Sequence, residues 1–281
     1  TDGLIDLSGM RLRLDGADEW VLPDGIYLEG HDHFIVWFDG DDLIRRGEFS
    51  GIVVDRSLPP SGASIELLTF EGRQLDQLRF GIQVIDQTIG RKGNQWQLLI
   101  EGTPGRVNGN AAPLGSPHDL RINEWSGGGD GDDWLELYHR GNQPVDISGL
   151  YLTDDPSLAG KTKHAIANLS FVGPKSWVVF RADGEPQRGS DHLNFRLSSK
   201  GETLRIYSES LNVIDEILVA DSLVQGGSNG RLSDGEDRLV SFDPVETSKG
   251  LPNHTQIEGL QINELLLTPR TPSGRAIEVF N

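Results

Sequence analysis

Trp134-Leu-Glu-Leu-Tyr138 places Leu135 and Leu137 on one face of an extended segment, and Glu136 on the other. This period of two is the pattern of a β-strand that buries one face in a core. Further along the chain the same period returns in Glu202-Thr-Leu-Arg-Ile-Tyr207 and in Val213-Ile-Asp-Glu-Ile-Leu-Val219, and turn-rich clusters separate such segments. Short strands joined by turns, without a helical stretch between them, predict a sandwich or a barrel.

The sequence repeats itself at a spacing of 140 residues. Leu120-Arg-Ile-Asn-Glu124 returns as Leu260-Gln-Ile-Asn-Glu264, and Ile5-Asp-Leu-Ser-Gly-Met-Arg-Leu12 returns as Val145-Asp-Ile-Ser-Gly-Leu-Tyr-Leu152. The glycine-arginine turn that ends at Arg91 likewise returns at Arg231. Several agreements in one order and at one spacing indicate a true internal repeat.

The phase of the repeat divides the chain into three parts. We predict a complete sandwich over residues 119–255, which open with the Ile-Asn-Glu and Leu-Glu-Leu-Tyr segments. Residues 1–116 form a sandwich that lacks these opening strands, and residues 257–281 contain the opening strands of a third repeat. We therefore expect the chain to be an excerpt of something longer. The residues expected to point inward are Leu135, Leu137, Leu152, Val179, Leu204, Ile206 and Ile214, with Leu7, Leu12, Val36, Ile65, Leu67 and Leu75 in the first part.

One family shows this order of segments. Ile-Asn-Glu, an acidic Gly-rich turn, Asp133-Trp-Leu-Glu-Leu-Tyr138, the stretch Pro144–Asp155 and the later segment His192–Glu202 together resemble the lamin-tail domain. The resemblance implies an all-β fold of tandem immunoglobulin-like antiparallel β-sandwiches. It also implies a secreted or cell-surface location, because bacterial members occur in such proteins, often beside hydrolase domains. The family has no catalytic residues to transfer, so we do not expect an enzyme.

Charge and composition exclude several classes of partner. Lysine and arginine total 25 against 43 aspartates and glutamates, which gives a formal charge of −18. Nucleic-acid binders need a basic surface, and so do proteins that dock on anionic lipid, so we expect neither partner. The absence of cysteine excludes disulfides and zinc-thiolate sites. No apolar run is long enough for a membrane helix, and no membrane insertion is expected.

The search for reactive groups finds weak candidates. Asp130, Asp132 and Asp133 lie in a Gly-rich loop, where carboxylates could hold calcium, although a solvated acidic turn is the preferred interpretation. His31 and His33 have a spacing that metal sites use, but the second repeat lacks them, so we expect an exposed loop. No cofactor is predicted.

Two sets of residues are expected to serve a structural role. Asn123 and Glu124 recur as Asn263 and Glu264, which suggests hydrogen bonds to backbone groups that a turn leaves unpaired. We also predict charge-assisted pairs of Arg231 with Glu124 and, between chains, of Arg91 with Glu264. Ile262, Asn263, Ile277 and Val279 are the expected strand-donor interface.

These observations favour a non-catalytic structural or adhesive module of an extracellular repeat protein. Residues 257–281 of one chain would complete residues 1–116 of the next, or of an adjacent repeat, by strand addition. Such head-to-tail contacts generate a filament when they do not close. The alternative is an accessory module of a secreted hydrolase that binds carbohydrate or protein. An exposed row formed by Trp20, Trp96 and Trp125 would favour the alternative, and their burial would favour the structural module.

Overall fold

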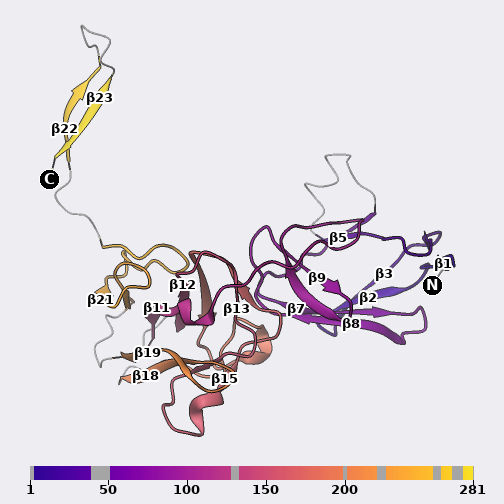
Figure 1. Cartoon of the computed structure of the whole chain (residues 1–281), viewed down its shortest axis with the longest axis horizontal. Coiled ribbons are helices and arrows are strands. Elements are labelled where there is room, and N and C mark those ends of the chain that lie inside the picture. Colours follow the sequence, from indigo (N-terminus) through magenta and orange to yellow (C-terminus); the bar gives the residue numbers. More distant parts are fainter. Residues whose placement is uncertain are drawn as a thin grey trace.

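The computed structural model describes residues 3–38, 51–127, 133–198, 201–219, 226–255, 261–267 and 275–280. The regular structure of these residues consists of β-strands and three short 3₁₀ helices, Pro117–Asp119, Gly160–Thr162 and Pro186–Arg188 (Figure 1). The expectation of an all-β fold is confirmed. Strand pairing is antiparallel in every described pair except β5–β6.

Residues 117–255, called the central unit here, contain two facing sheets. The larger has the order β17-β12-β11-β20-β21 and the smaller has the order β15-β14-β18-β19, while β13 and β16 form a separate pair. The bounds of these strands are β11 Leu120–Ser126, β12 Trp134–His139, β13 Val145–Asp146, β14 Tyr151–Thr153, β15 His164–Ala165, β16 Phe171–Val172, β17 Ser176–Arg181, β18 Glu202–Tyr207, β19 Val213–Val219, β20 Ser228–Arg231 and β21 Leu239–Phe242.

The core of the central unit lies between these two sheets, as in a β-sandwich. Ile122, Leu135 and Leu137 come from the larger sheet, and Leu204 and Ile206 come from the smaller one. Each is at most 1% exposed, and full burial of such a side chain contributes about 1.5–3 kcal/mol. Most of the inward residues expected for this unit are therefore buried. Val179 and Ile214 are the exceptions, because both are only half-buried.

The described part of residues 3–116, called the first unit, contains one four-stranded sheet and three separate pairs. The sheet has the order β3-β2-β7-β8, and the pairs are β1–β4, β5–β6 and β9–β10. The bounds are β1 Ile5–Asp6, β2 Arg11–Leu14, β3 Asp18–Val21, β4 Tyr27–Leu28, β5 Val36–Phe38, β6 Ile52–Val54, β7 Ala63–Leu68, β8 Gln74–Phe80, β9 Thr88–Lys92 and β10 Gln95–Leu99.

The register of strand pairs in the first unit recurs in the central unit. β7 pairs with β8 with a register shift at Leu67/Leu68, and β18 pairs with β19 with a register shift at Ile206/Tyr207. Asp76 lies opposite Leu67, as Asp215 lies opposite Ile206. Positions expected to correspond from the sequence thus occupy corresponding places in the sheets.

The core of the first unit is less buried than that of the central unit. Leu12, Ile65 and Leu67 are half-buried, whereas their counterparts Leu152, Leu204 and Ile206 are fully buried. Leu75 was expected to point inward but is exposed. Leu75 is the residue of β8 that the register shift leaves without a partner on β7, so it falls outside the regular alternation of inward and outward side chains.

The two units meet along the segment that follows β8. The Gly81 N–H donates to Asn168 O at 2.9 Å, and the Phe171 N–H donates to Ile82 O at 2.8 Å. Ile82 packs against the core of the central unit. Gly81 allows this close approach, because a Cβ there would lie 1.9 Å from Ser170 Oγ.

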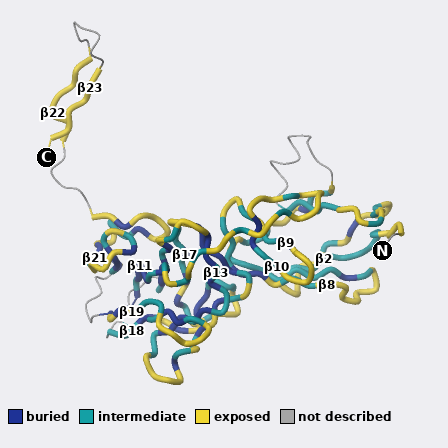
Figure 2. The backbone as a smooth tube through the Cα atoms, viewed as in Figure 1, coloured by how far each residue is buried: buried dark blue, intermediate teal, exposed yellow. Residues whose placement is uncertain are grey.

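The last two strands stand apart from both units. β22 (Gln261–Leu266) and β23 (Ala276–Phe280) form a hairpin that lies away from the rest of the chain (Figure 1). Every described residue of the hairpin is exposed (Figure 2). Ile262 and Ile277 therefore do not pack against their own central unit.

Candidate strand-binding site

A salt bridge in the central unit holds the backbone of β11. The Arg231 N–H at Nε donates to Ile122 O at 2.8 Å, and Asp215 Oδ2 accepts from the Ile122 N–H at 2.8 Å. Arg231 Nη2 and Asp215 Oδ2 are 3.0 Å apart, with the two side chains only 5% and 12% exposed. Arginine and aspartate therefore act together as a clamp on both polar groups of one residue.

The clamp corrects the expected pairing of Arg231 with Glu124. The register of β11 on β12 shifts between Ile122 and Glu124, so Asn123 is an extra residue in the ladder. Such a bulge re-aims neighbouring side chains. Among the described contacts, the carboxylate of Glu124 is satisfied by two serines, and the guanidinium of Arg231 bonds to Asp215 instead.

Glu124 lies in a closed cradle of hydrogen-bond donors. Its carboxylate accepts from the hydroxyl of Ser228, from the hydroxyl of Ser248 at 2.9 Å and from the Ser248 N–H at 3.2 Å. The side chain is fully buried. A buried carboxylate needs such donors, because they replace the water that it loses.

Asn123 and Asn253 connect β11 to the loops around it. Asn123 Oδ1 accepts from the Gly235 N–H at 3.0 Å, and its amide nitrogen donates to Glu136 at 2.9 Å. Asn253 donates to Arg231 O at 2.8 Å and to Asn123 O at 3.4 Å. Asn123 therefore does bond to a backbone group of a turn, which is the role expected of it.

Glu136 lies opposite Glu124 across the β11–β12 ladder. Burial raises the pKa of Glu136 to about 8, an effect that hydrogen bonds from Asn123 and from the Gly250 N–H partly offset and that the charge of Glu124 reinforces. Glu136 therefore holds its proton at neutral pH. Both carboxyl groups are fully buried, so this acidic pair offers no surface to a substrate.

The C-terminal hairpin reproduces the geometry of β11–β12. Ile262 lies opposite Val279 and Glu264 lies opposite Glu278, with a register shift at the position of Asn263. Asn263 donates to the carboxylate of Glu278, as Asn123 donates to Glu136. Ile262 and Ile277 are 71% and 62% exposed. The hairpin thus has the pairing of the two middle strands of the larger sheet, but among the described strands it pairs with no others.

Among its described residues, the first unit has no strands that correspond to this hairpin. In the central unit, β11 and β12 lie between β20 and β17. The counterparts of β20 and β17 in the first unit are β9 and β5, and among the described strands β9 pairs only with β10 and β5 only with β6. The two middle strands have no counterpart among residues 3–38 and 51–116.

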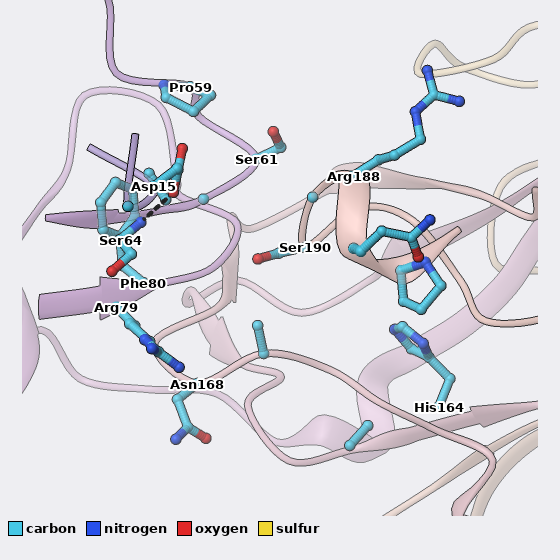
Figure 3. Close-up of a pocket in the computed structure, with 18 of the residues that line it drawn as sticks. Asp15, Pro59, Ser61, Ser64, Arg79, Phe80, His164, Asn168, Arg188 and Ser190 are labelled. Atoms are coloured by element: carbon cyan, nitrogen blue, oxygen red, sulfur yellow. Dashed lines mark hydrogen bonds between the residues drawn. The ribbon is translucent and has the colours of Figure 1, made fainter. Parts of the chain in front are cut away.

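A cleft of about 780 Å³ lies between the two units (Figure 3). Asp15, Ser64 and Arg79 line it from the first unit, and His164 and Arg188 line it from the central unit. Asp15 Oδ1 already accepts from the Ser64 N–H at 2.8 Å, and Arg188 already pairs with two nearby carboxylates. Burial lowers the pKa of His164, so it is neutral at neutral pH. The cleft depends on how the units dock, which no local sequence pattern signals.

The remaining sequence candidates do not converge on a reactive site. Asp130 and Asp132 lie outside the described residues, and Asp133 Oδ2 accepts from the Leu197 N–H at 3.1 Å. His31 and His33 are exposed in a loop. In the part of the chain that the structure describes, no three His, Asp or Glu side chains gather closely enough to hold a metal ion.

Sequence reasoning missed most of the groups that hold β11, although a signal for them is present. Ser248-Lys-Gly-Leu-Pro-Asn253 has a counterpart in Thr103-Pro-Gly-Arg-Val-Asn108, and Asp215 has one in Asp76. These matches are short and drift in spacing, so they stand out only when strand pairing fixes the alignment.

No described helix is long or apolar enough to cross a membrane. Comparison with protein-family models, with curated proteins and with solved structures finds no match to this chain.

Proposed function

We propose that this chain is a non-catalytic structural module of a secreted or cell-surface repeat protein. In this proposal its units are immunoglobulin-like sandwiches of the lamin-tail type that join head to tail by strand complementation and build a fibre. The observation that carries the proposal is the exposed hairpin β22–β23, whose pairing and register shift copy those of the buried hairpin β11–β12.

The hairpin would fit between two strand pairs of the first unit, β9–β10 and β5–β6. In the central unit β12 pairs with β17, and β11 pairs with β20. By the same pattern β23 would pair with β5, and β22 would pair with β9. The joint would restore a continuous sheet, and it would cover unpaired strand edges that otherwise invite unspecific association.

Burial of the hairpin's apolar face would drive the joint. Ile262, Leu265, Ile277 and Val279 are all exposed, and their counterparts in the central unit all belong to its core. Removing one such side chain from water contributes about 1.5–3 kcal/mol. The half-buried residues Leu12, Ile65 and Leu67 of the first unit would gain cover at the same time.

The positions of the three tryptophans support the structural module over the carbohydrate-binding alternative. Trp125 is buried in the core of the central unit. Trp20 and Trp96 are half-buried and lie on β3 and β10 of the first unit, which belong to different sheets. An exposed aromatic platform would require at least two such rings side by side on the surface.

Analytical ultracentrifugation of the full 281-residue chain tests the proposal. We expect mass to increase with protein concentration, and we expect Ile262→Asp to abolish the increase, because it places a charge in the core of the joint. Gln261→Asp is the matched control, because the counterpart of Gln261 is the partly exposed Arg121. A chain that stays monomeric at all concentrations, or an Ile262→Asp variant that associates normally, would overturn the proposal.

A further inference from the structure

Arg91 and Asp76 of the first unit repeat the clamp formed by Arg231 and Asp215. Arg91 Nη2 lies 3.2 Å from Asp76 Oδ2, and the two residues occupy the same positions in β9 and β8 as the central pair does in β20 and β19. Their side chains are 44% and 50% exposed, whereas those of the central pair are 5% and 12% exposed. In the central unit the clamp holds Ile122 of β11, a strand that has no described counterpart in the first unit.

Asn108 repeats the role of Asn253. Its amide nitrogen donates to Arg91 O at 2.8 Å, as that of Asn253 donates to Arg231 O at 2.8 Å. Each amide packs closely against a glycine. A Cβ added at Gly90 or at Gly230 would lie 3.0 Å from the amide nitrogen of Asn108 or Asn253, respectively. Asn253 also reaches the backbone of β11 at Asn123 O. Asn108 is exposed.

Thr103 and Thr88 repeat the two serines that hold Glu124. Thr103 begins a turn in which the Arg106 N–H donates to its carbonyl oxygen at 3.1 Å, and Ser248 begins the matching turn with Leu251. Thr88 lies opposite Leu99 in β9–β10, as Ser228 lies opposite Phe242 in β20–β21. These correspondences place two hydroxyls where the carboxylate cradle lies in the central unit.

Among the described residues, the hydroxyl of Thr103 has no hydrogen-bond partner. Its Oγ1 is shielded from water and forms no hydrogen bond, whereas the hydroxyl of Ser248 donates to Glu124 at 2.9 Å. An unsatisfied buried polar group costs about 1–3 kcal/mol. A carboxylate acceptor in the position of Glu124 would remove this cost.

We infer that these five residues of the first unit form a receptor site for the Ile262–Glu264 segment of a second copy of the chain. Arg91 and Asp76 would hold the carbonyl and N–H of Ile262, Asn108 would donate to Asn263 O, and the hydroxyls of Thr88 and Thr103 would donate to the Glu264 carboxylate. This inference rests on the proposed strand complementation and identifies Ile262–Glu264 as the segment that the first unit recognises. Glu264 therefore meets threonine hydroxyls in this site, and Arg91, its expected partner, meets the backbone of Ile262.

The exposed segment has the features that such a site requires. It carries the same Ile-Asn-Glu sequence as β11 and the same register shift at its asparagine. Glu264 is exposed and acidic, and the donors of the site are hydroxyls, an amide and a guanidinium, so donors face acceptors throughout. An unrelated strand could pair with β9 but could not fill the cradle.

A double-mutant cycle on the self-association of the full chain tests the site. Thr103→Val removes the hydroxyl at nearly constant volume, and Glu264→Gln removes the charge from an exposed position. We expect each to raise the dissociation constant at least about tenfold, and we expect the double variant to be no weaker than the more affected single variant. Thr203→Val, the same exchange in β18 away from the site, is the matched control. Circular dichroism of each variant confirms that it is folded.

The outcomes separate the site from the joint itself. If Ile262→Asp abolishes association while Thr103→Val and Glu264→Gln leave it unchanged, or if their effects simply add, the receptor site is wrong and strand complementation stands. If the full chain does not associate, both proposals fail.

Discussion

The carboxyl group of Glu136 shows how strongly the sheet alters one side chain. Burial raises its pKa from the ordinary 4.5 to about 8, so the folded chain binds this proton more tightly than the unfolded chain does. The stabilisation linked to the proton is fully present below pH 4.5 and is lost as the pH rises towards 8. Asn123 and the Gly250 N–H each donate a hydrogen bond to one of its two oxygens.

The first prediction concerns the pH dependence of this residue. The free energy of unfolding of the central unit should fall by up to about 1.4 kcal/mol per pH unit between pH 7 and 8. Glu202, whose pKa burial raises to about 7, contributes mainly below that window. Glu136→Gln should flatten the slope, because glutamine carries no charge at any pH. Urea denaturation between pH 5 and 9 measures both slopes, and parallel profiles would contradict the assignment.

Arg231 and Arg91 allow a second comparison at the same scale, because one clamp is buried and the other is exposed. Arg231→Ala would leave Asp215 buried without its cation and Ile122 O without a donor. We expect a loss of about 3–5 kcal/mol in the free energy of unfolding of the central unit. Arg91→Ala should cost less than about 1 kcal/mol in the monomer, because its pair is exposed. Urea denaturation of the two variants below the concentration of self-association measures the difference, and equal losses would argue against it.

The partner of Arg231 shows where sequence reasoning at single residues reaches its limit. The recurrence of Arg91 and Arg231 marks two corresponding positions, and each arginine pairs with an aspartate. Their partners could not be predicted, because a bulge at Asn123 decides which groups β11 presents to each neighbour. Alternation with a period of two assumes a regular ladder, and it fails at Leu75 for the same reason.

At the scale of elements, the strands are predictable and their junctions are not. The alternating segments around Leu135 and Leu204 are strands with those residues in the core, because inward side chains leave a period that survives without tertiary information. The cleft of Figure 3 and the contact at Gly81 have no such period, since they depend on surfaces from distant parts of the chain.

The third prediction concerns the contact between the two units. A methyl group at Gly81 would collide with Ser170 Oγ, so Gly81→Ala should separate the segments that the Phe171 N–H and Ile82 O join. We expect faster hydrogen exchange at the Phe171 amide. Gly3→Ala is the control, because a Cβ at Gly3 has open space around it. Unchanged exchange at Phe171 would show that the junction tolerates the added group.

At the scale of the whole molecule, net charge opposes any association between copies. Each chain carries a formal charge of −18, and at low salt such charges repel over distances of tens of ångströms. The free energy gained by burying the apolar face of the hairpin does not depend on salt in this way. Association is therefore a competition between a long-range repulsion and a short-range burial.

The fourth prediction follows from this competition. The dissociation constant for self-association should fall as sodium chloride is raised from about 20 to about 300 mM, because the screening length shortens from about 20 Å to below about 8 Å. Sedimentation velocity across a salt series measures it, with sodium sulfate at matched ionic strength as a control for the kind of ion. Weaker association at high salt would show that attraction between opposite charges dominates the contact.

The exposed hairpin and the strand pairs β5–β6 and β9–β10 lie in different parts of the chain, so an assembly built through the proposed joint would have a direction. In the proposed joint, a strand donor near one terminus and an acceptor near the other would make the two ends of a fibre chemically different, however many copies it contains. Growth at one end would require a free acceptor, and growth at the other would require a free donor. A single chain whose acceptor is already filled would terminate one end while leaving the opposite end able to grow. Fibre length could then be set by the ratio of capped to uncapped chains.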